Sequence, residues 1–262
     1  MTRKPPPRPT PSREPRDKQD WISRALARSG ILSLSEAEEA VRGGRVRLSG
    51  RVVRQPFAVV QPGEDIRLDG HRVQLRRETR VLVFHKPSGV VTAPEDAHSR
   101  GDTAFTLLAA RLPPELQGYG WHAVGRLDRL TTGLLLFTND ERFVGHATSP
   151  ATHLPRRYVA EVQGGATEEK LEPLRRGMTL DDGPTRPAEA RCLDARHVAV
   201  TLTEGRFHQV KRMLGAVGLP VRRLHREAVG TLTLDVPEGE FRELSAEEVQ
   251  QGLGFPAAAQ PR

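Results

Sequence analysis

The sequence predicts an α+β protein of two domains, a minidomain followed by a larger domain of the size of an enzyme. A length of 262 residues suits one large or two ordinary domains. Two short helices and a small hairpin sheet are predicted in the first part of the chain. From Arg80 onward short β-rich runs alternate with turns and helical stretches, which is typical of an α+β domain.

The composition indicates a basic protein. The chain has 40 Lys and Arg against 33 Asp and Glu, a formal charge of +7. This charge favours a polyanionic partner, most often nucleic acid, with a merely solubilising surface as the alternative. The longest apolar runs, such as 134–137, fall far short of the roughly 18 residues of a membrane span, and the N-terminus has no apolar signal segment. The single Cys192 excludes an intramolecular disulfide and a thiolate-rich metal site. We therefore expect a soluble, cytoplasmic protein with no membrane partner.

Both ends of the chain are predicted to be disordered. Residues 1–18 contain six prolines, six Lys or Arg and two acidic residues, so this basic arm either contacts phosphate or remains a solvated tail. The last seven residues, 256–262, form a second frayed end. Between these ends we expect a small domain with its linker at 19–78 and a catalytic domain at 79–255.

The small domain begins with two predicted helices. Apolar residues recur at helical spacing over 21–29, and a second helix is predicted over 36–42. Two capping boxes fit the start of the second helix, and they are Ser33 with Glu36 and Ser35 with Glu38. The alternating pattern over 45–53, with a turn at 49–50, predicts a hairpin, and a further strand is expected over 65–68.

Arginines on the first helix and around the junction of helix and hairpin are candidate RNA contacts. A cluster of this kind can bind the phosphates of folded RNA by charge and shape. The alternative is that they are ordinary solvated charges. The candidates are Arg24, Arg28, Arg42, Arg45, Arg47 and Arg51.

This first domain resembles the S4 RNA-binding domain of ribosomal protein S4 and several RNA-modifying enzymes. The resemblance lies in the helix at 21–29, in SEAEEAVRGGRVRLSGRVV and in PGEDIRLDG. The usual Arg-Leu-Asp-Lys opening is replaced here by Trp21-Ile22-Ser23-Arg24, so the contacts of the first helix differ from those of the family pattern.

The larger domain is predicted to contain five strands and four helices. Its strands are expected at 81–84, 134–138, 158–162, 197–202 and 232–234, and its helices at 104–111, 168–176, 207–217 and 246–251. In the helix at 207–217 we expect Phe207, Val210, Leu214 and Val217 to face the core, which leaves Lys211 and Arg212 on the polar side.

One segment of this domain carries the strongest chemical signal. In GRLDRLTTG, at 125–133, an aspartate stands between two arginines on a loop that leads into an apolar strand. The flanking positive charge favours an ionised carboxylate, as a nucleophile or base requires, although a structural ion pair is the alternative. The sequence has no P-loop, no HExxH and no GxSxG motif, so it lacks the signals of several other enzyme classes.

The segment GRLDRLTTGLLLFTND resembles the signature of the bacterial ribosomal-RNA pseudouridine synthases. Three further stretches are similar to motifs of that family and follow in its order, HKPSGVVT at 85–92, PRRYVAEV at 155–162 and EGRFHQVKRMLGAVGLPVRRLHREAVGTLTLD at 204–235. The resemblance implies a mixed, largely antiparallel sheet flanked by helices. It also implies a reaction in which the N-glycosidic bond of uridine is broken and the base is rotated and rejoined through C5, without a cofactor or metal.

The resemblance assigns roles to individual residues. Asp128 matches the essential aspartate, which attacks either C6 of the uracil or C1′ of the ribose. Arg126 matches the arginine that helps to extrude the target nucleotide, Tyr158 the tyrosine that stacks on the uracil, and Lys211 the basic partner of the aspartate. Arg156 stands where many relatives have lysine. We expect further RNA contacts from Lys86, Arg129, Arg206, His208 and Arg212.

The third motif resembles the small-subunit branch of the family. That branch has an aromatic residue and a histidine where the large-subunit branch more often has Asn-Arg, and Phe207-His208 and the stretch LHRE at 224–227 are of the former type. We therefore expect a monomeric enzyme that modifies 16S rRNA, in free or partly assembled small subunits, with 23S rRNA as the alternative. A non-catalytic RNA-binding assembly protein is a second alternative. A glycosidase would need two carboxylates, and the nearby Asp140 and Glu141 lie at the far end of the predicted strand.

Overall fold

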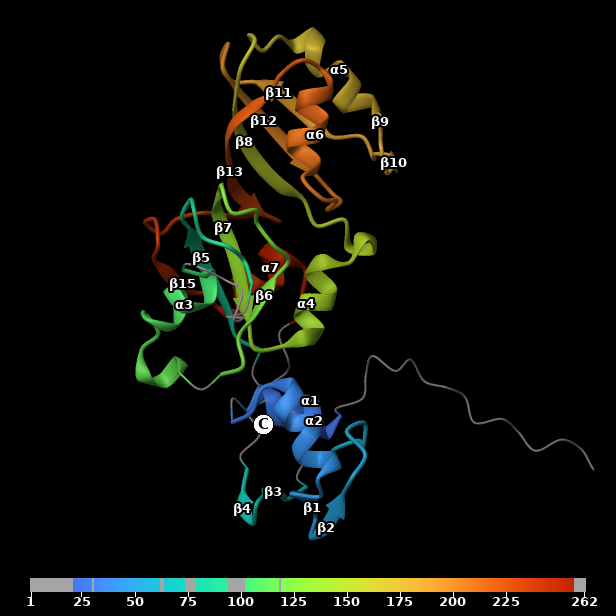
Figure 1. Cartoon of the computed structure of the whole chain (residues 1–262), viewed down its shortest axis with the longest axis vertical. Helices are drawn as coiled ribbons and strands as arrows, with labels where there is room; N and C mark the ends of the chain where they lie inside the picture. The colour runs from blue at the N-terminus through green and yellow to red at the C-terminus, as the bar shows by residue number, and fades with distance from the viewer. Residues whose placement is uncertain are drawn as a thin grey trace, which may run out of the picture. The chain divides into compact units, whose positions relative to one another are not determined.

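The computed structural model describes residues 21–29, 31–61, 64–73, 79–93, 102–117 and 119–256, without the side chains of Arg28 and Glu115. The predicted arm at 1–18 lies outside these residues, as does the predicted tail from 257 onward. The chain forms two compact units, one ending at residue 76 and the other beginning at residue 77 (Figure 1).

The first unit packs two helices against a small antiparallel sheet. Helix α1 spans Ile22–Arg28 and α2 spans Leu34–Arg42, and the strands are β1 (Val46–Leu48), β2 (Arg51–Val53), β3 (Ile66–Leu68) and β4 (His71–Arg72) in the order β2-β1-β3-β4. Ser33 and Glu36 form the capping box of α2, so the first of the two candidate boxes is confirmed. Ser49 and Gly50 both have positive φ, which is the two-residue hairpin turn that the sequence predicts.

The second unit is built on a large mixed sheet. Within the described residues it has nine strands, seven of them in the order β11-β12-β8-β13-β7-β5-β15, with β14 beside β13 and β6 beside β7. Only β13 and β7 pair in parallel, so the expected mixed, largely antiparallel sheet is confirmed. The strands are β5 (Val81–Lys86), β6 (His122–Val124), β7 (Thr131–Thr138), β8 (Arg156–Val162), β11 (Glu189–Cys192), β12 (His197–Leu202), β13 (Val221–Val229), β14 (Leu232–Thr233) and β15 (Phe241–Glu243).

Five α-helices of the described residues cover this sheet. They are α3 (Ala104–Ala109), α4 (Glu141–Thr148), α5 (Glu168–Arg176), α6 (Gln209–Ala216) and α7 (Ala246–Leu253). Helices α5 and α6 lie over the β8, β11 and β12 part of the sheet, whereas α4 and α7 lie near β6 and β7 (Figure 1). None of the helices in the described ranges is long and apolar enough to span a membrane.

Strand β7 shows why its sequence is a continuous apolar run. Leu134 and Leu136 pack into the core beneath α4 and α7, while Leu135 and Phe137 pack into a second core with α3. Successive side chains of a strand point to opposite faces, and both faces are covered here, so the alternation of apolar and polar residues is lost. This buried strand is the fixed base from which the preceding loop, with Asp128, extends.

Two expectations for this unit are corrected by the structure. Helix α6 begins at Gln209, and Phe207 lies before it with 69% of its surface exposed, so it does not face the core as expected. Helix α4 was not predicted. Its N-cap is Asp140, which accepts hydrogen bonds from Arg142 and Thr79 and is buried, so this carboxylate has a structural role.

Candidate active site

Asp128 lies on the loop between β6 and β7, and neighbouring backbone fixes this loop. The Thr92 hydroxyl donates to the carbonyl of Leu127 at 3.0 Å and accepts from the Leu127 amide at 3.2 Å. Gly89 and Arg129 are joined in the same way, since the Gly89 amide donates to the Arg129 carbonyl at 2.8 Å and Arg129 Nε donates to the Gly89 carbonyl at 3.0 Å. The carboxylate is therefore held on both sides, as a preorganised site requires.

Two basic side chains from the α6 region meet the carboxylate. Lys211 Nζ donates to Asp128 Oδ2 at 2.8 Å, and His208 Nε2 lies 3.3 Å from Asp128 Oδ1. About a third of the Asp128 side chain remains exposed, which leaves room for a reacting atom. The expected pairing of Asp128 with Lys211 is thus present in the geometry, across 83 positions of sequence.

A pocket opens beside this carboxylate. Tyr158 enters it from β8 and is half-buried, whereas Arg126 is exposed at its edge. Within the described residues neither the Tyr158 hydroxyl nor the Arg126 guanidinium forms a hydrogen bond or ion pair, so both polar groups remain open to a ligand. The pocket is lined by Arg126, Leu127, Asp128, Thr131, Tyr158, Leu202, Glu204, Gly205, Arg206, His208, Gln209, Val210 and Leu224.

Lys86 does not have the role that we predicted. Its side chain is fully buried, and its ammonium donates to the carbonyls of Pro87 at 2.8 Å, Val90 at 2.6 Å and Arg129 at 3.3 Å. Burial lowers the pKa of Lys86 to about 8. With all three of its donors used by backbone, Lys86 fixes the loop behind Asp128, and the prediction that it contacts RNA is wrong.

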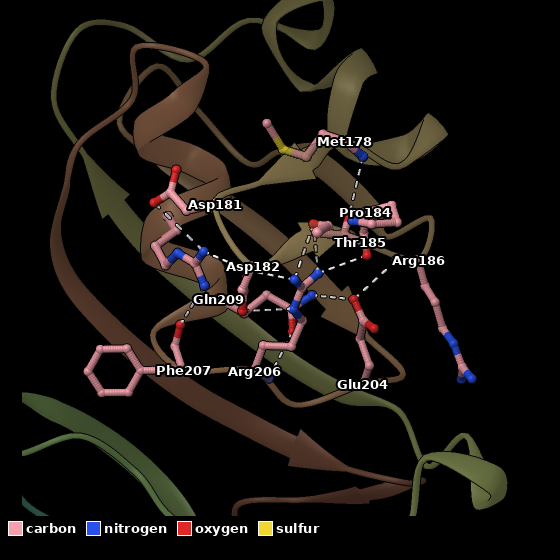
Figure 2. A network of polar contacts seen from close by, with 12 residues as sticks. Met178, Asp181, Asp182, Pro184, Thr185, Arg186, Glu204, Arg206, Phe207 and Gln209 are labelled. Carbon is pink, nitrogen blue, oxygen red and sulfur yellow. Dashed lines mark hydrogen bonds and ion pairs between the residues drawn. The ribbon is translucent and has the colours of Figure 1, made fainter.

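The side chains of Arg206 and Arg212 are also bonded within the protein, and Figure 2 shows Arg206 among its partners. Arg206 uses its donors on the Asp182 carboxylate and on the carbonyls of Gly183 and Pro184, and only 17% of its side chain is exposed. Arg212 donates to the Phe207 carbonyl at 3.2 Å and to Asp182 at 2.6 Å. Its hydrogen bond to Asp182 is the main reason that the pKa of this carboxyl is held far below its usual range. The two arginines tie the start of α6 to the turn between β9 (Thr179–Leu180) and β10 (Gly183–Pro184). Arg206 also lines the pocket, and contact of either arginine with RNA stays a prediction.

The other predicted RNA contacts remain on the surface. Arg129 is exposed next to Asp128, although its Nε is held by Gly89. In the first unit Arg24 lies over the Trp21 ring at 4.4 Å, Arg42 pairs with Glu38, Arg45 with Asp69, Arg47 donates to the Gly50 carbonyl, and Arg51 is exposed. Such exposed ion pairs contribute little to stability and can be exchanged for phosphate. The side chain of Arg28 lies outside the described part.

Sequence reasoning missed two residues that support the site. Thr92 was quoted in a motif, but nothing indicated that its hydroxyl would hold Leu127. Arg226 is 3% exposed on β13, and its Nε donates to the Leu134 carbonyl at 2.7 Å. The only signal for Arg226 was its place in LHRE, and an arginine in a strand is ordinarily exposed. Among the described residues no group of three or more His, Cys, Asp or Glu is placed to hold a metal ion.

The fold and the site together define an RNA-modifying enzyme with a carboxylate in a basic pocket. The family model described as RNA pseudouridylate synthase matches residues 80–216, and the S4 domain model matches 21–66. The chain therefore belongs to the RNA pseudouridylate synthase family and carries an S4 domain, which confirms both resemblances. The expected fold class is also confirmed.

Named relatives include enzymes of both ribosomal subunits. The chain is 33% identical to "Ribosomal large subunit pseudouridine synthase B" of Bacillus subtilis (strain 168), over 88% of the chain and 94% of the relative. It is 35% identical to "Ribosomal small subunit pseudouridine synthase A" of Yersinia pestis, over 87% of the chain and 94% of the relative. Among solved structures, "Crystal structure of pseudouridylate synthase" is 30% identical with a TM-score of 0.62 and covers 88% of this chain and 98% of that one.

Proposed function

We propose that this enzyme converts a specific uridine of ribosomal RNA to pseudouridine, with Asp128 as the nucleophile. One observation carries the proposal: the Asp128 carboxylate, 2.8 Å from Lys211 Nζ, opens into a pocket whose other face is Tyr158. The names of the relatives, which specify ribosomal RNA, support the substrate class. The basic surface of the chain suits the same partner.

The reaction has four requirements, and a different side chain can meet each of them. A stacked uridine hides its glycosidic bond, so the nucleotide must be extruded, and Arg126 at the pocket edge is placed to occupy the vacated position. Tyr158 presents an aromatic face on which the extruded uracil stacks. Asp128 then attacks C6 of the ring or C1′ of the ribose, and Lys211 orients the carboxylate through its hydrogen bond.

The atoms balance without an external reagent. The bond between C1′ and N1 breaks, the uracil rotates in the pocket, and a bond between C1′ and C5 forms. The bond to the Asp128 oxygen is broken again, the proton on C5 leaves and N1 gains a proton, so the product is an isomer of the substrate. A pocket that holds the detached base is needed because the base would otherwise diffuse away.

We infer that the substrate is the small-subunit, 16S RNA. The support is the third motif, in which Phe207-His208 stands where the large-subunit branch more often has Asn-Arg, together with the LHRE stretch at 224–227. The relatives named as large-subunit enzymes, at 33–37% identity, favour 23S RNA as the second candidate.

The test is a conversion assay on both RNAs. Full-length 16S and 23S transcripts, which contain no pseudouridine, are incubated with the purified protein, and pseudouridines are mapped by chemical labelling and primer extension. We expect one new stop in the 16S transcript, absent with Asp128→Asn. A stop in 23S RNA alone would overturn the subunit assignment. Binding without any conversion, in transcripts and in partly assembled subunits, would favour the non-catalytic assembly protein.

A further inference from the structure

Phe207 is an exposed aromatic side chain beside the pocket. Its exposed fraction of 69% is the highest among the large hydrophobic side chains described as exposed in this structure. One face of the ring is stacked on His208, with centroids 3.8 Å apart and planes at 23°. The rest of the ring is largely exposed, so an aromatic surface beside the pocket is available to a ligand.

The turn that carries Phe207 is rigid. His208 adopts a left-handed conformation, with φ of +49°, which places Phe207 outside α6. The Arg206 amide donates to Gln209 Oε1 at 3.1 Å, and Gln209 Nε2 donates to Glu204. Figure 2 shows the ring of Phe207 pointing away from this network, while its carbonyl accepts from Arg212. These bonds fix the backbone on either side of Phe207, and the ring points away from them.

The stack leads directly to the nucleophile. His208, on which Phe207 lies, places its Nε2 3.3 Å from Asp128 Oδ1 and lines the pocket. Phe207 thus lies against the face of the same imidazole ring whose Nε2 meets the reacting carboxylate. A nucleotide adjacent to the one that enters the pocket stays tethered to it by a single phosphodiester linkage, so its base remains near the pocket rim, where Phe207 lies.

We propose that Phe207 is a stacking platform for the base next to the target uridine. The proposal rests on the proposed function, because it assumes that a uridine enters the pocket. Extrusion of that uridine removes a stacking partner from its neighbour, and the open face of Phe207 replaces it. Stacking accepts any base, so Phe207 contributes affinity and position, while sequence selection lies elsewhere. This makes Phe207 a positioning residue for the reaction.

The test combines protein and RNA changes. The probe is a synthetic oligoribonucleotide centred on the uridine that the wild-type enzyme converts, with either neighbour intact or replaced by an abasic nucleotide. Single-turnover rates and affinities are measured for the wild type, Phe207→Ala, Phe207→Trp and the control Leu193→Ala, which removes another exposed hydrophobic side chain on the turn after β11. Affinities are measured in the Asp128→Asn background, so that no conversion occurs.

We expect Phe207→Ala to weaken affinity about 5- to 150-fold on the intact probe, the effect of losing one stacked base. Phe207→Trp and Leu193→Ala should match the wild type. On the probe that lacks the stacked neighbour, Phe207→Ala and wild type should become equal, because the interaction is then already absent.

Three results would overturn the proposal. One is an unchanged affinity and rate for Phe207→Ala. Another is an equal loss on the intact and both abasic probes, which would assign Phe207 to the protein structure. The third is a loss for Phe207→Trp as large as that for Phe207→Ala, since tryptophan keeps the aromatic face. An inactive wild-type enzyme on every RNA would instead refute the proposed function on which this inference rests.

Discussion

A methyl group at position 133 should disrupt the central sheet next to the active site. Gly133 lies on β7 opposite Arg226 of β13, with φ of +111°. A Cβ at this position would lie 2.2 Å from the Arg226 carbonyl oxygen and 2.7 Å from its nitrogen. Both are backbone atoms of a paired strand, so no side-chain rotation can relieve the contact. In Gly133→Ala the two strands must therefore separate.

The cost follows from three contributions. A non-glycine residue at this φ is strained by roughly 1–3 kcal/mol. Overpacking against a fixed neighbour adds about 1–3 kcal/mol. Displacement of β13 also weakens the bond from Arg226 Nε to the Leu134 carbonyl, worth about 1 kcal/mol or more because that group is buried. We expect a loss of about 4 kcal/mol in the free energy of unfolding, which is a large part of the stability of an ordinary domain.

Thermal and denaturant unfolding of the purified proteins would measure this loss. A change of about 4 kcal/mol corresponds to a fall in Tm of about 8–16 °C for a domain of this size. The control is Gly145→Ala in α4, where an added Cβ would meet no atom within 4 Å. That change should raise stability by up to about 1 kcal/mol because alanine is the better helix former. If Gly133→Ala unfolds within 1 kcal/mol of the wild type, the argument from close strand approach is wrong.

The remaining predictions concern chemistry, RNA binding and pH. Asp128→Asn should abolish conversion but keep folding and RNA affinity, as judged by melting and by titration with RNA, because the amide keeps the shape without the charge. Tyr158→Phe should retain affinity, whereas Tyr158→Ala should lose about 1–3 kcal/mol; equal losses in both variants would argue against stacking. Replacing Arg45 and Arg47 by glutamine should flatten the plot of log affinity against log salt by about 1.5, and an unchanged slope would mean that neither meets phosphate. Between pH 8 and 10.5 the unfolded chain holds the Lys86 proton that the folded chain has lost, so unfolding free energy should rise across this window by up to about 3 kcal/mol, relative to Lys86→Met.

Much of the fold could be predicted because local signals and tertiary structure agree. The local sequence and the observed structure agree at three places, which are the hairpin turn at 49–50, the Ser33–Glu36 capping box and the apolar run of β7. Strand β13 was missed because arginines and a histidine interrupt its apolar pattern. One of these arginines, Arg226, is buried and donates a hydrogen bond to the Leu134 carbonyl of β7. That contact joins positions 92 residues apart, and no local pattern records it.

Residues that were chosen because they match a family motif lie together in the structure. Residues that were chosen only for their positive charge do not all lie on the surface. Asp128 and Tyr158 line the same pocket, and Lys211 donates to Asp128, so the residues that the motifs single out lie together. Lys86 and Arg206 carry the same charge as the surface arginines, but backbone carbonyls and Asp182 take up their donors. Positive charge in a sequence cannot tell an internal donor from a phosphate ligand, because both uses need the same hydrogen bonds.

This division of the basic residues has a consequence for catalysis. Under the proposed function, phosphates of the bound RNA come near Asp128 and repel its carboxylate. The exposed Arg126 and Arg129 flank Asp128 in the sequence and can pair with those phosphates. Lys211 belongs to α6 and donates to Oδ2 at 2.8 Å, so the carboxylate already has a cationic partner within the protein. The internal bonds of Arg206 and Arg212 fix the start of that helix, so under the same proposal they help to hold Lys211 against Asp128.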